Sequence, residues 1–312
     1  MEVQDNNLIS PRNLKASRRH YFYGLETASD EQVFAAWESA YGAWLGDPHA
    51  INRTYENVVK PQFAETGQTL SLIIPAYREA HRIHRSIELA KRFHAKFPLP
   101  LEVLYIVERS PDDTLQRAKE AAAGAPHIRV IDNGLRRGKG HAVRSGMARA
   151  TGDIMMFADT DLSVPLHQVI LFLEHLLRRQ DVQVLIGQRL RLSARGPVRR
   201  TLSAAFRGVI SCLGRLPATW DTQCGFKAFR RDAGHRLFEM QQTDGFAFDV
   251  ELLLLARSQG YRVDSSPVLW LNDERSTVRP ACDFLPFARE LQRLRQRFAD
   301  PASAQFHNRV RY

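Results

Sequence analysis

Short apolar runs alternate with longer amphipathic stretches from Thr69 to Gly187. The apolar runs have the length of one strand and are bounded by polar residues, which is typical of buried strands. In the amphipathic stretches apolar residues recur at helical spacing. The predicted strands are 70–76, 101–107, 128–131, 153–158 and 182–187, and the predicted helices are 79–93, 112–123, 140–150 and 165–179. This order predicts an α/β fold with a doubly wound, mostly parallel sheet and flanking helices.

The two ends of the chain depart from this rhythm. Between Asp30 and Leu45 aromatic and apolar residues recur at helical spacing, with Asp30 as the expected N-cap and Gly46 as the expected stop. Beyond Gln188 the pattern predicts an amphipathic stretch at 198–216, a helix at 249–259, a strand at 262–270 and a last helix at 283–298. We therefore expect a helical N-terminal extension over 1–68, a main domain over 69–298 and a tail over 299–312.

Composition narrows the classes of partner. The 312 residues carry a formal net charge of +10, which favours phosphates, nucleic acid or an anionic membrane face. The three cysteines are widely spaced, which argues against a disulfide framework and a zinc cluster. No apolar run reaches the ~18–20 residues that span a bilayer, and the polar N-terminus has no signal-peptide core. We expect a cytoplasmic protein, with peripheral contact at the inner membrane face as the alternative. Because the arginines interleave with aliphatic residues, no nucleic acid is expected as a partner.

The strand predicted at 153–158 is followed directly by Asp159-Thr160-Asp161. Residues i and i+2 of an extended chain point the same way, so both carboxylates leave the end of the strand together. In open α/β sheets ligands bind at that edge. Two carboxylates this close repel each other unless a cation or a proton lies between them, and they suit a hard divalent cation that holds a diphosphate. The alternative is a solvated turn.

Other candidate residues also lie at the ends of predicted strands or the starts of predicted helices. Residues 136–141 (RRGKGH) open a helix, where backbone N–H groups favour a phosphate; the alternative is a tight basic turn. Glu79 and Glu108 follow the first two strands and are placed to accept hydrogen bonds from a base or ribose. Asp249 is a candidate base or positioning group. For Glu79 and Asp249 the alternative is a carboxylate that favours a helix N-terminus.

Together these motifs make the chain resemble the family-2 glycosyltransferases, which have a GT-A fold. The matching elements are residues 74–77 (IPAY), 138–144 (GKGHAVR), 158–161 (ADTD), 221–227 (DTQCGFK) and 248–251 (FDVE). The last two resemble the branch of dolichyl-phosphate β-glucosyltransferases and polyprenyl-phosphate mannosyltransferases. The resemblance covers residues 69–298, but where the family usually has Asp-Asp-Gly-Ser, this chain has Glu108 followed by Arg109.

The resemblance implies an inverting transfer of a hexose from a nucleoside-diphosphate sugar, with Mg²⁺ or Mn²⁺ bound by Asp159 and Asp161. UDP-glucose is the favoured donor, and GDP-mannose is a less favoured one. The implied nucleotide-binding residues are Pro75, Tyr77, Glu79, Glu108, Lys139 and Asp159. The implied catalytic residues are Asp161, Lys227 and Asp249, and the expected acceptor-binding residues are Arg189, Arg199 and Gln223.

Two acceptors are compatible with this chemistry. A polyprenyl phosphate is already anionic, so its transfer rests on alignment and on stabilisation of the leaving diphosphate rather than on a strong base. Arg189 and Arg199 would then hold the acceptor phosphate, and the amphipathic stretch 198–216 would lie at the headgroup level. The alternative is a soluble hydroxyl acceptor, such as a natural product, a peptide or a protein, for which Asp249 would have to act as the base.

Overall fold

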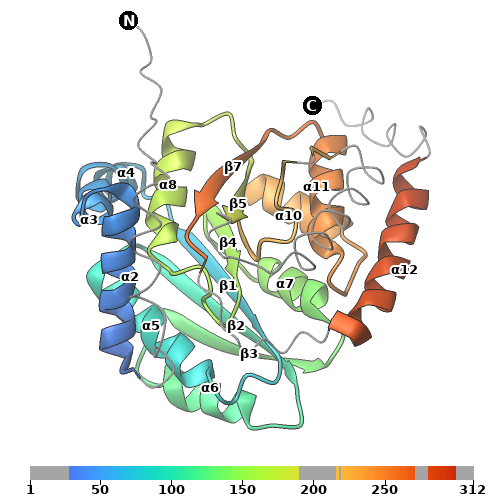
Figure 1. Ribbon diagram of the computed structural model, residues 1–312, viewed down its shortest axis with the longest axis horizontal. Helices are drawn as coiled ribbons and strands as arrows, with labels where there is room; N and C mark the ends of the chain where they lie inside the picture. Colours follow the sequence, from blue (N-terminus) through green and yellow to red (C-terminus); the bar gives the residue numbers. More distant parts are fainter. Residues whose placement is uncertain (1–27, 190–215, 218, 271–279, 300–312) are drawn as a thin grey trace, which may run out of the picture.

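The computed structural model describes residues 28–189, 216–217, 219–270 and 280–299, with a seven-stranded sheet at its centre (Figure 1). The strands are β1 (Leu70–Ala76), β2 (Leu101–Arg109), β3 (Ile128–Leu135), β4 (Ile154–Ala158), β5 (Val184–Arg189), β6 (Phe226–Arg230) and β7 (Val263–Val268). Their order in the sheet is β3-β2-β1-β4-β6-β5-β7. Strand β6 pairs antiparallel with β4 and β5, and the other neighbouring pairs are parallel. The predicted α/β fold with a mostly parallel sheet is confirmed.

Helices cover both faces of the sheet. Leu72 and Ile74 of β1 belong to one buried cluster and Ile73 to the other, because successive side chains of a strand point to opposite faces. This is why the central strands read as continuous apolar runs. The first cluster includes α5 (Ile83–Lys96), α6 (Thr114–Ala122) and α8 (Gln168–Arg178). The second includes α7 (Lys139–Met147), α10 (Arg231–Met240), α11 (Phe248–Ser258) and α12 (Pro280–Ala299) (Figure 1).

The N-terminal segment 28–68 is helical and shares the first core cluster. Its elements are α2 (Asp30–Leu45), α3 (Ala50–Thr54), a π-helical turn (Tyr55–Val59) and α4 (Lys60–Thr66). They lie along α5 and α8 on the outer side of the molecule (Figure 1). The N-cap of α2 is Ser29 rather than Asp30, because Ser29 and Gln32 form a reciprocal capping box. None of the described helices has the length and apolar character needed to cross a membrane.

Several element boundaries differ from the sequence prediction. Strand β6 and helix α10 were not predicted, since Lys227 and Arg230 break the apolar pattern of β6. Strand β3 continues to Leu135 instead of ending at Ile131. Helix α5 begins at Ile83, and Glu79 belongs to the turn before it, where the Arg82 amide donates to the Glu79 carbonyl at 2.9 Å. The amphipathic stretch predicted at 198–216 lies outside the described residues, apart from its last residue.

Candidate active site

The C-terminal ends of β1 and β4 meet where the strand order reverses, which is the place where open α/β sheets bind ligands. Asp159, Thr160 and Asp161 follow β4 directly. The Thr160 hydroxyl donates to the carbonyl of Pro75 in β1. The Ser163 amide donates to Asp161 Oδ1 at 2.9 Å. These two contacts fix the loop between the carboxylates and hold both at the ligand-binding edge.

A lysine stands beside the first carboxylate. Lys139, the first residue of α7, places Nζ 2.6 Å from Asp159 Oδ1. Burial lowers the pKa of Lys139, but the negative charges of Asp159, Asp249 and Asp161 outweigh this effect and leave its pKa raised. Lys139 therefore remains charged, and its contact with Asp159 brings two of the predicted site residues together.

The carboxylates around Asp161 are crowded. Burial raises the pKa of Glu79 to about 7; its ion pair with Arg82 opposes the shift, and the charges of Asp161 and Asp159 add to it. Burial likewise raises the pKa of Asp161, and the charge of Asp159 raises it further. Both shifts mean that full ionisation of these carboxylates costs free energy in the folded protein. A bound cation would lower this cost.

Strand β6 contributes a buried ion pair behind these carboxylates. Lys227 is fully buried, and its Nζ lies 2.5 Å from Asp249 Oδ1. The same ammonium donates to the carbonyls of Thr222 at 3.0 Å and Cys224 at 2.6 Å, so its three donors are used. Burial raises the pKa of Asp249, and the charges of Lys227 and Lys139 oppose that shift. The pair supports the wall of the site, and the catalytic roles expected for Lys227 and Asp249 stay predictions.

A second ion pair lies at the end of β5. Arg189, the last residue of β5, contacts Asp221 through Nε at 2.6 Å and Nη2 at 2.7 Å. Its guanidinium lies 5.6 Å from the centre of the Trp270 ring. Arg189 and Trp270 share with Asp159 and Gly225 the lining of a cavity of about 20 Å³. The arginine expected to hold an acceptor phosphate thus lies next to the first carboxylate, with its charge balanced by Asp221.

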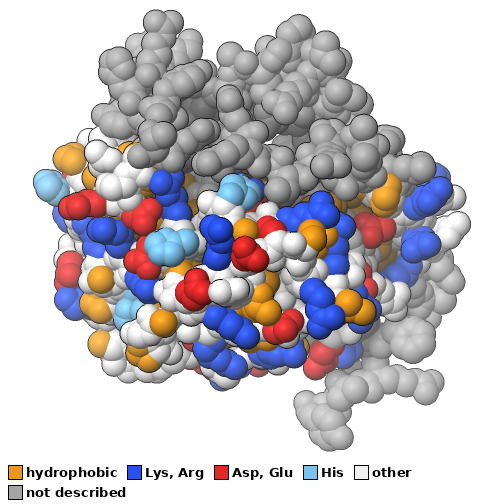
Figure 2. Space-filling model, turned by 90° about the horizontal axis from the view of Figure 1, so that it is seen from below, with side chains coloured by type: hydrophobic (Ala, Val, Ile, Leu, Met, Phe, Trp, Pro, Cys, Tyr) orange, Lys and Arg blue, Asp and Glu red, His pale blue; other side chains and the backbone are white. Residues whose placement is uncertain are grey.

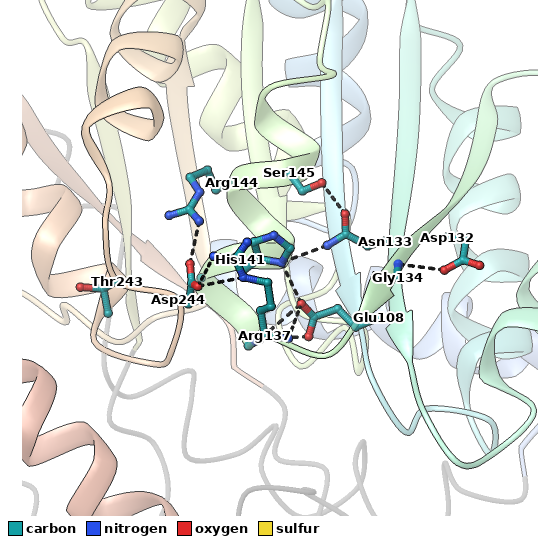
Figure 3. A network of polar contacts seen from close by, with 12 residues as sticks. Glu108, Asp132, Asn133, Gly134, Arg137, His141, Arg144, Ser145, Thr243 and Asp244 are labelled. Atoms are coloured by element: carbon teal, nitrogen blue, oxygen red, sulfur yellow. Dashed lines mark hydrogen bonds and ion pairs between the residues drawn. The ribbon is translucent and has the colours of Figure 1, made fainter.

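Glu108 organises the start of α7 (Figure 3). Its buried carboxylate accepts hydrogen bonds from the amides of Arg137 and Gly138, each at 3.1 Å, and lies 3.0 Å from Nδ1 of His141. Arg137 also donates to Asp244 on the far side of the turn. Because a carboxylate of the protein already accepts these amides, the geometry favours the tight basic turn over the phosphate cradle. A nucleoside contact of Glu108 stays a prediction.

The remaining predicted residues are less closely tied to the carboxylates. Tyr77 is half-buried, and the Arg136 guanidinium lies 4.3 Å from its ring centre. Nε2 of Gln223 is buried and has no hydrogen-bond partner among the described residues. Arg199 lies outside the described residues.

The sequence pattern missed three residues of the site. Arg82 stands three residues after Glu79, a spacing at which opposite charges pair, so this signal was present. Asp221 lay within a quoted motif but had no assigned role. Trp270 follows the last strand, and nothing in its local sequence marks it as part of a site.

The carboxylates of Asp159 and Asp161 fit a divalent cation whose coordination is completed by phosphate oxygens. Mg²⁺ is commonly bound by one or two carboxylates together with phosphate oxygens. Asp159 and Asp161 supply two carboxylates at one loop. No group of three metal-ligating side chains occurs in the described ranges, so a cation here would depend on phosphate for the rest of its coordination.

Comparison with known proteins agrees with this geometry. Residues 71–238 match the model of Glycosyl transferase family 2. A dolichyl-phosphate beta-glucosyltransferase of Drosophila melanogaster is 31% identical, over 78% of this chain and 79% of that protein. The protein of the same name from Saccharomyces cerevisiae is 28% identical over 80% of each. The structure of glucosyl-3-phosphoglycerate synthase from Mycobacterium tuberculosis with Mn²⁺, uridine diphosphate and phosphoglyceric acid has a TM-score of 0.57 at 22% identity, over 80% of this chain and 83% of that one. That structural likeness shows a shared GT-A fold.

Proposed function

Because the chain belongs to glycosyl transferase family 2, we propose that it transfers glucose from UDP-glucose to a polyprenyl phosphate. The observation that carries this proposal is the pair Asp159 and Asp161 at the switch point, with Lys139 at 2.6 Å from the first of them. The relatives named dolichyl-phosphate beta-glucosyltransferase align over about four-fifths of the chain and support glucose as the sugar and a polyprenyl phosphate as the acceptor.

On the donor side, Asp159 and Asp161 would bind Mg²⁺ or Mn²⁺ together with the diphosphate. The ion, when bound, supplies positive charge that stabilises the leaving diphosphate. Lys139 adds a second positive charge at the same carboxylate. Glu79 is held by Arg82 beside these groups, in the place where we expect the nucleoside.

The burial of Asp249 supports a phosphate acceptor. A hydroxyl acceptor needs a base that can reach its proton. The Asp249 carboxylate instead is buried against Lys227, with 4% of its side chain exposed. A phosphate acceptor is already anionic and needs only to be aligned. Arg189, at the edge of the same site, is the described arginine that we assign to the acceptor side.

The charge distribution does not favour nucleic acid as an alternative partner. On the face shown in Figure 2, Lys and Arg side chains are interspersed with Asp and Glu side chains. Proteins that bind nucleic acid usually gather basic side chains in a patch or stripe. The net charge of +10 is therefore better matched to phosphorylated small substrates and an anionic headgroup surface.

UDP-glucose with Mn²⁺ is expected to raise the melting temperature of the protein. A ligand that binds only the folded state adds about 2.7 kcal/mol at one hundred times its dissociation constant. For a chain of this size that corresponds to a rise of roughly 4 °C. Differential scanning fluorimetry with UDP-glucose, GDP-mannose and CDP-glucose measures it. An equal or larger shift with GDP-mannose would contradict the choice of donor.

The acceptor is tested with purified protein, UDP-glucose, Mn²⁺ and a short-chain polyprenyl phosphate in detergent. We expect a glucosylated lipid phosphate, detected by mass spectrometry. If the protein binds UDP-glucose but yields only free glucose, the lipid acceptor is wrong. Incubation with a panel of soluble hydroxyl compounds then tests the alternative.

Substituting Gly225 is expected to lower activity much more than stability. A Cβ on Gly225 would lie 2.1 Å from Oδ2 of Asp159, so Gly225→Ala must push this carboxylate aside. A displacement of about 1 Å at a reacting site typically lowers kcat/KM about 10²-fold. The control is Gly234→Ala in α10, where the nearest atom is the flexible Met155 sulfur at 3.2 Å. Equal kcat/KM values in the two variants would refute the close approach.

A further inference from the structure

The N-terminal segment 28–68 packs around His167, the residue that precedes α8. The His167 ring is 1% exposed, and its centre lies 4.5 Å from Phe34, 5.9 Å from Trp37 and 5.9 Å from Tyr41, all on α2. Neither ring nitrogen has a hydrogen-bond partner among the described residues. Burial lowers the pKa of His167 to about 3, so the ring is neutral at physiological pH. Aromatic packing by α2, together with Phe97 at 5.7 Å, therefore holds the start of α8 in place.

The next residue connects α2 to the far edge of the sheet. Gln168 is fully buried, and its Oε1 accepts the Tyr41 hydroxyl at 2.9 Å. Its Nε2 donates to the carbonyl of Pro267 in β7 at 3.1 Å. Pro267 lies opposite Gln188 in the parallel pairing of β7 with β5, one position before Arg189. The side-chain amide of Gln168 thus connects the N-terminal segment to β7, which leads to Trp270 and pairs with β5, the strand that ends at Arg189.

The chain between Asp161 and α8 has no exposed residue, so its conformational freedom is restricted. Residues 162–170 are all buried. Leu162 has a φ of +48°, which is a strained conformation for a residue with a side chain. Such strain persists only where the surrounding structure enforces it. The start of α8 is therefore a rigid support for the loop that carries both carboxylates.

We propose that the N-terminal segment positions the active site through Tyr41 and Gln168. Gln168 is a positioning residue for the loop 159–163 and for Arg189, which lines the same cavity. This inference rests on the proposed function only in taking that loop as the donor-binding loop. The segment thereby has a role in catalysis as well as in folding, although none of its described side chains lines the cavity between Asp159 and Trp270.

The test compares two substitutions that each remove one phenolic oxygen from the same segment. Tyr41→Phe breaks the contact with Gln168, whereas Tyr55→Phe breaks a contact with the Pro98 carbonyl at 3.0 Å, which lies before β2 and outside the stretch 159–168. Gln168→Met removes both hydrogen bonds of the bridge at similar volume. If Gln168→Met does not fold, Tyr41→Phe still carries the test, because it removes a single atom.

Hydrogen exchange of the full-length protein without ligand is the first readout. We expect faster exchange of the amides in peptides covering 160–164 in Tyr41→Phe and Gln168→Met, and no change there in Tyr55→Phe. The second readout is the affinity for UDP with Mn²⁺ by titration calorimetry. We expect it to fall about three- to tenfold in the first two variants, the range that corresponds to one lost hydrogen bond, and to stay unchanged in the control.

The two readouts separate this inference from the proposed function. If the wild-type protein has no affinity for UDP with Mn²⁺, the proposed donor is wrong, and hydrogen exchange alone decides whether the segment supports the loop. If wild type binds UDP but exchange at 160–164 and affinity are the same in Tyr41→Phe as in Tyr55→Phe, the segment only stabilises the fold and the inference is overturned.

Discussion

Replacing Asp161 with asparagine is expected to lower kcat about 10²- to 10³-fold, the usual loss when one charge-stabilising group is removed from an active site. The same change should leave the melting temperature equal or higher. Burial and the charge of Asp159 raise the pKa of Asp161, so its ionisation destabilises the folded state. A carboxyl group with a raised folded pKa contributes stability that is lost as pH rises through that pKa, and an uncharged amide does not have this loss.

The measurements are steady-state kinetics with UDP-glucose and thermal unfolding at pH 7. Asp181→Asn is the matched control, because Asp181 is an exposed carboxylate in surface ion pairs with Arg179 and Arg262. It should change neither activity nor stability by much. A wild-type kcat in Asp161→Asn would refute its role in catalysis. Unfolding well below wild type would show that Asp161 stabilises the fold.

Replacing Lys227 with methionine is expected to lower the free energy of unfolding by about 3–5 kcal/mol, the usual effect of breaking a buried ion pair. The substitution leaves the Asp249 carboxylate buried without its cation and also leaves the carbonyls of Thr222 and Cys224 without their donor. Chemical denaturation monitored by tryptophan fluorescence gives the value.

The double variant Lys227→Met with Asp249→Leu is the informative comparison. A well-packed apolar pair often matches a buried ion pair in stability, so the double variant should recover most of the loss. If it recovers stability but remains inactive, the pair is needed for function as well as for the wall of the site. If the single variant is as stable as wild type, the buried geometry is wrong.

The sequence predicted the strands whose own residues form a continuous apolar run. The runs that became β1, β2 and β4 are apolar at almost every position, because both faces of these strands are covered by helices. Strand β6 was missed because Lys227, its second residue, is of a type more often found in solvated loops. Lys227 is accommodated inside because Asp249, on another element, balances its charge and the carbonyls of Thr222 and Cys224 accept its remaining hydrogen bonds. No local pattern contains that information.

In the candidate site, too, the positions of some residues were predicted from the sequence, whereas their contacts were not. Asp159 and Asp161 were predicted to lie at the edge of the sheet, since strand ends can be read from the apolar runs. The partners of the predicted residues could not be read in this way. Glu108 binds the turn at Gly138, and Arg189 binds Asp221, about thirty residues apart in each case. Such contacts depend on how the sheet brings distant segments together.

The position of β6 also bears on the order in which the protein assembles during synthesis. Strands β1 to β5 leave the ribosome first, yet β4 and β5 cannot pair with each other, because β6 lies between them. Until residues 226–230 emerge, β4 presents an unpaired edge, and the closure of such long-range pairings is slow. Gly225 and Lys227 arrive with that strand, so β6 fills the gap between β4 and β5 and brings two residues of the binding site in the same step. A ribosome-bound fragment that stops before β6 should therefore be open to proteases and lack donor binding.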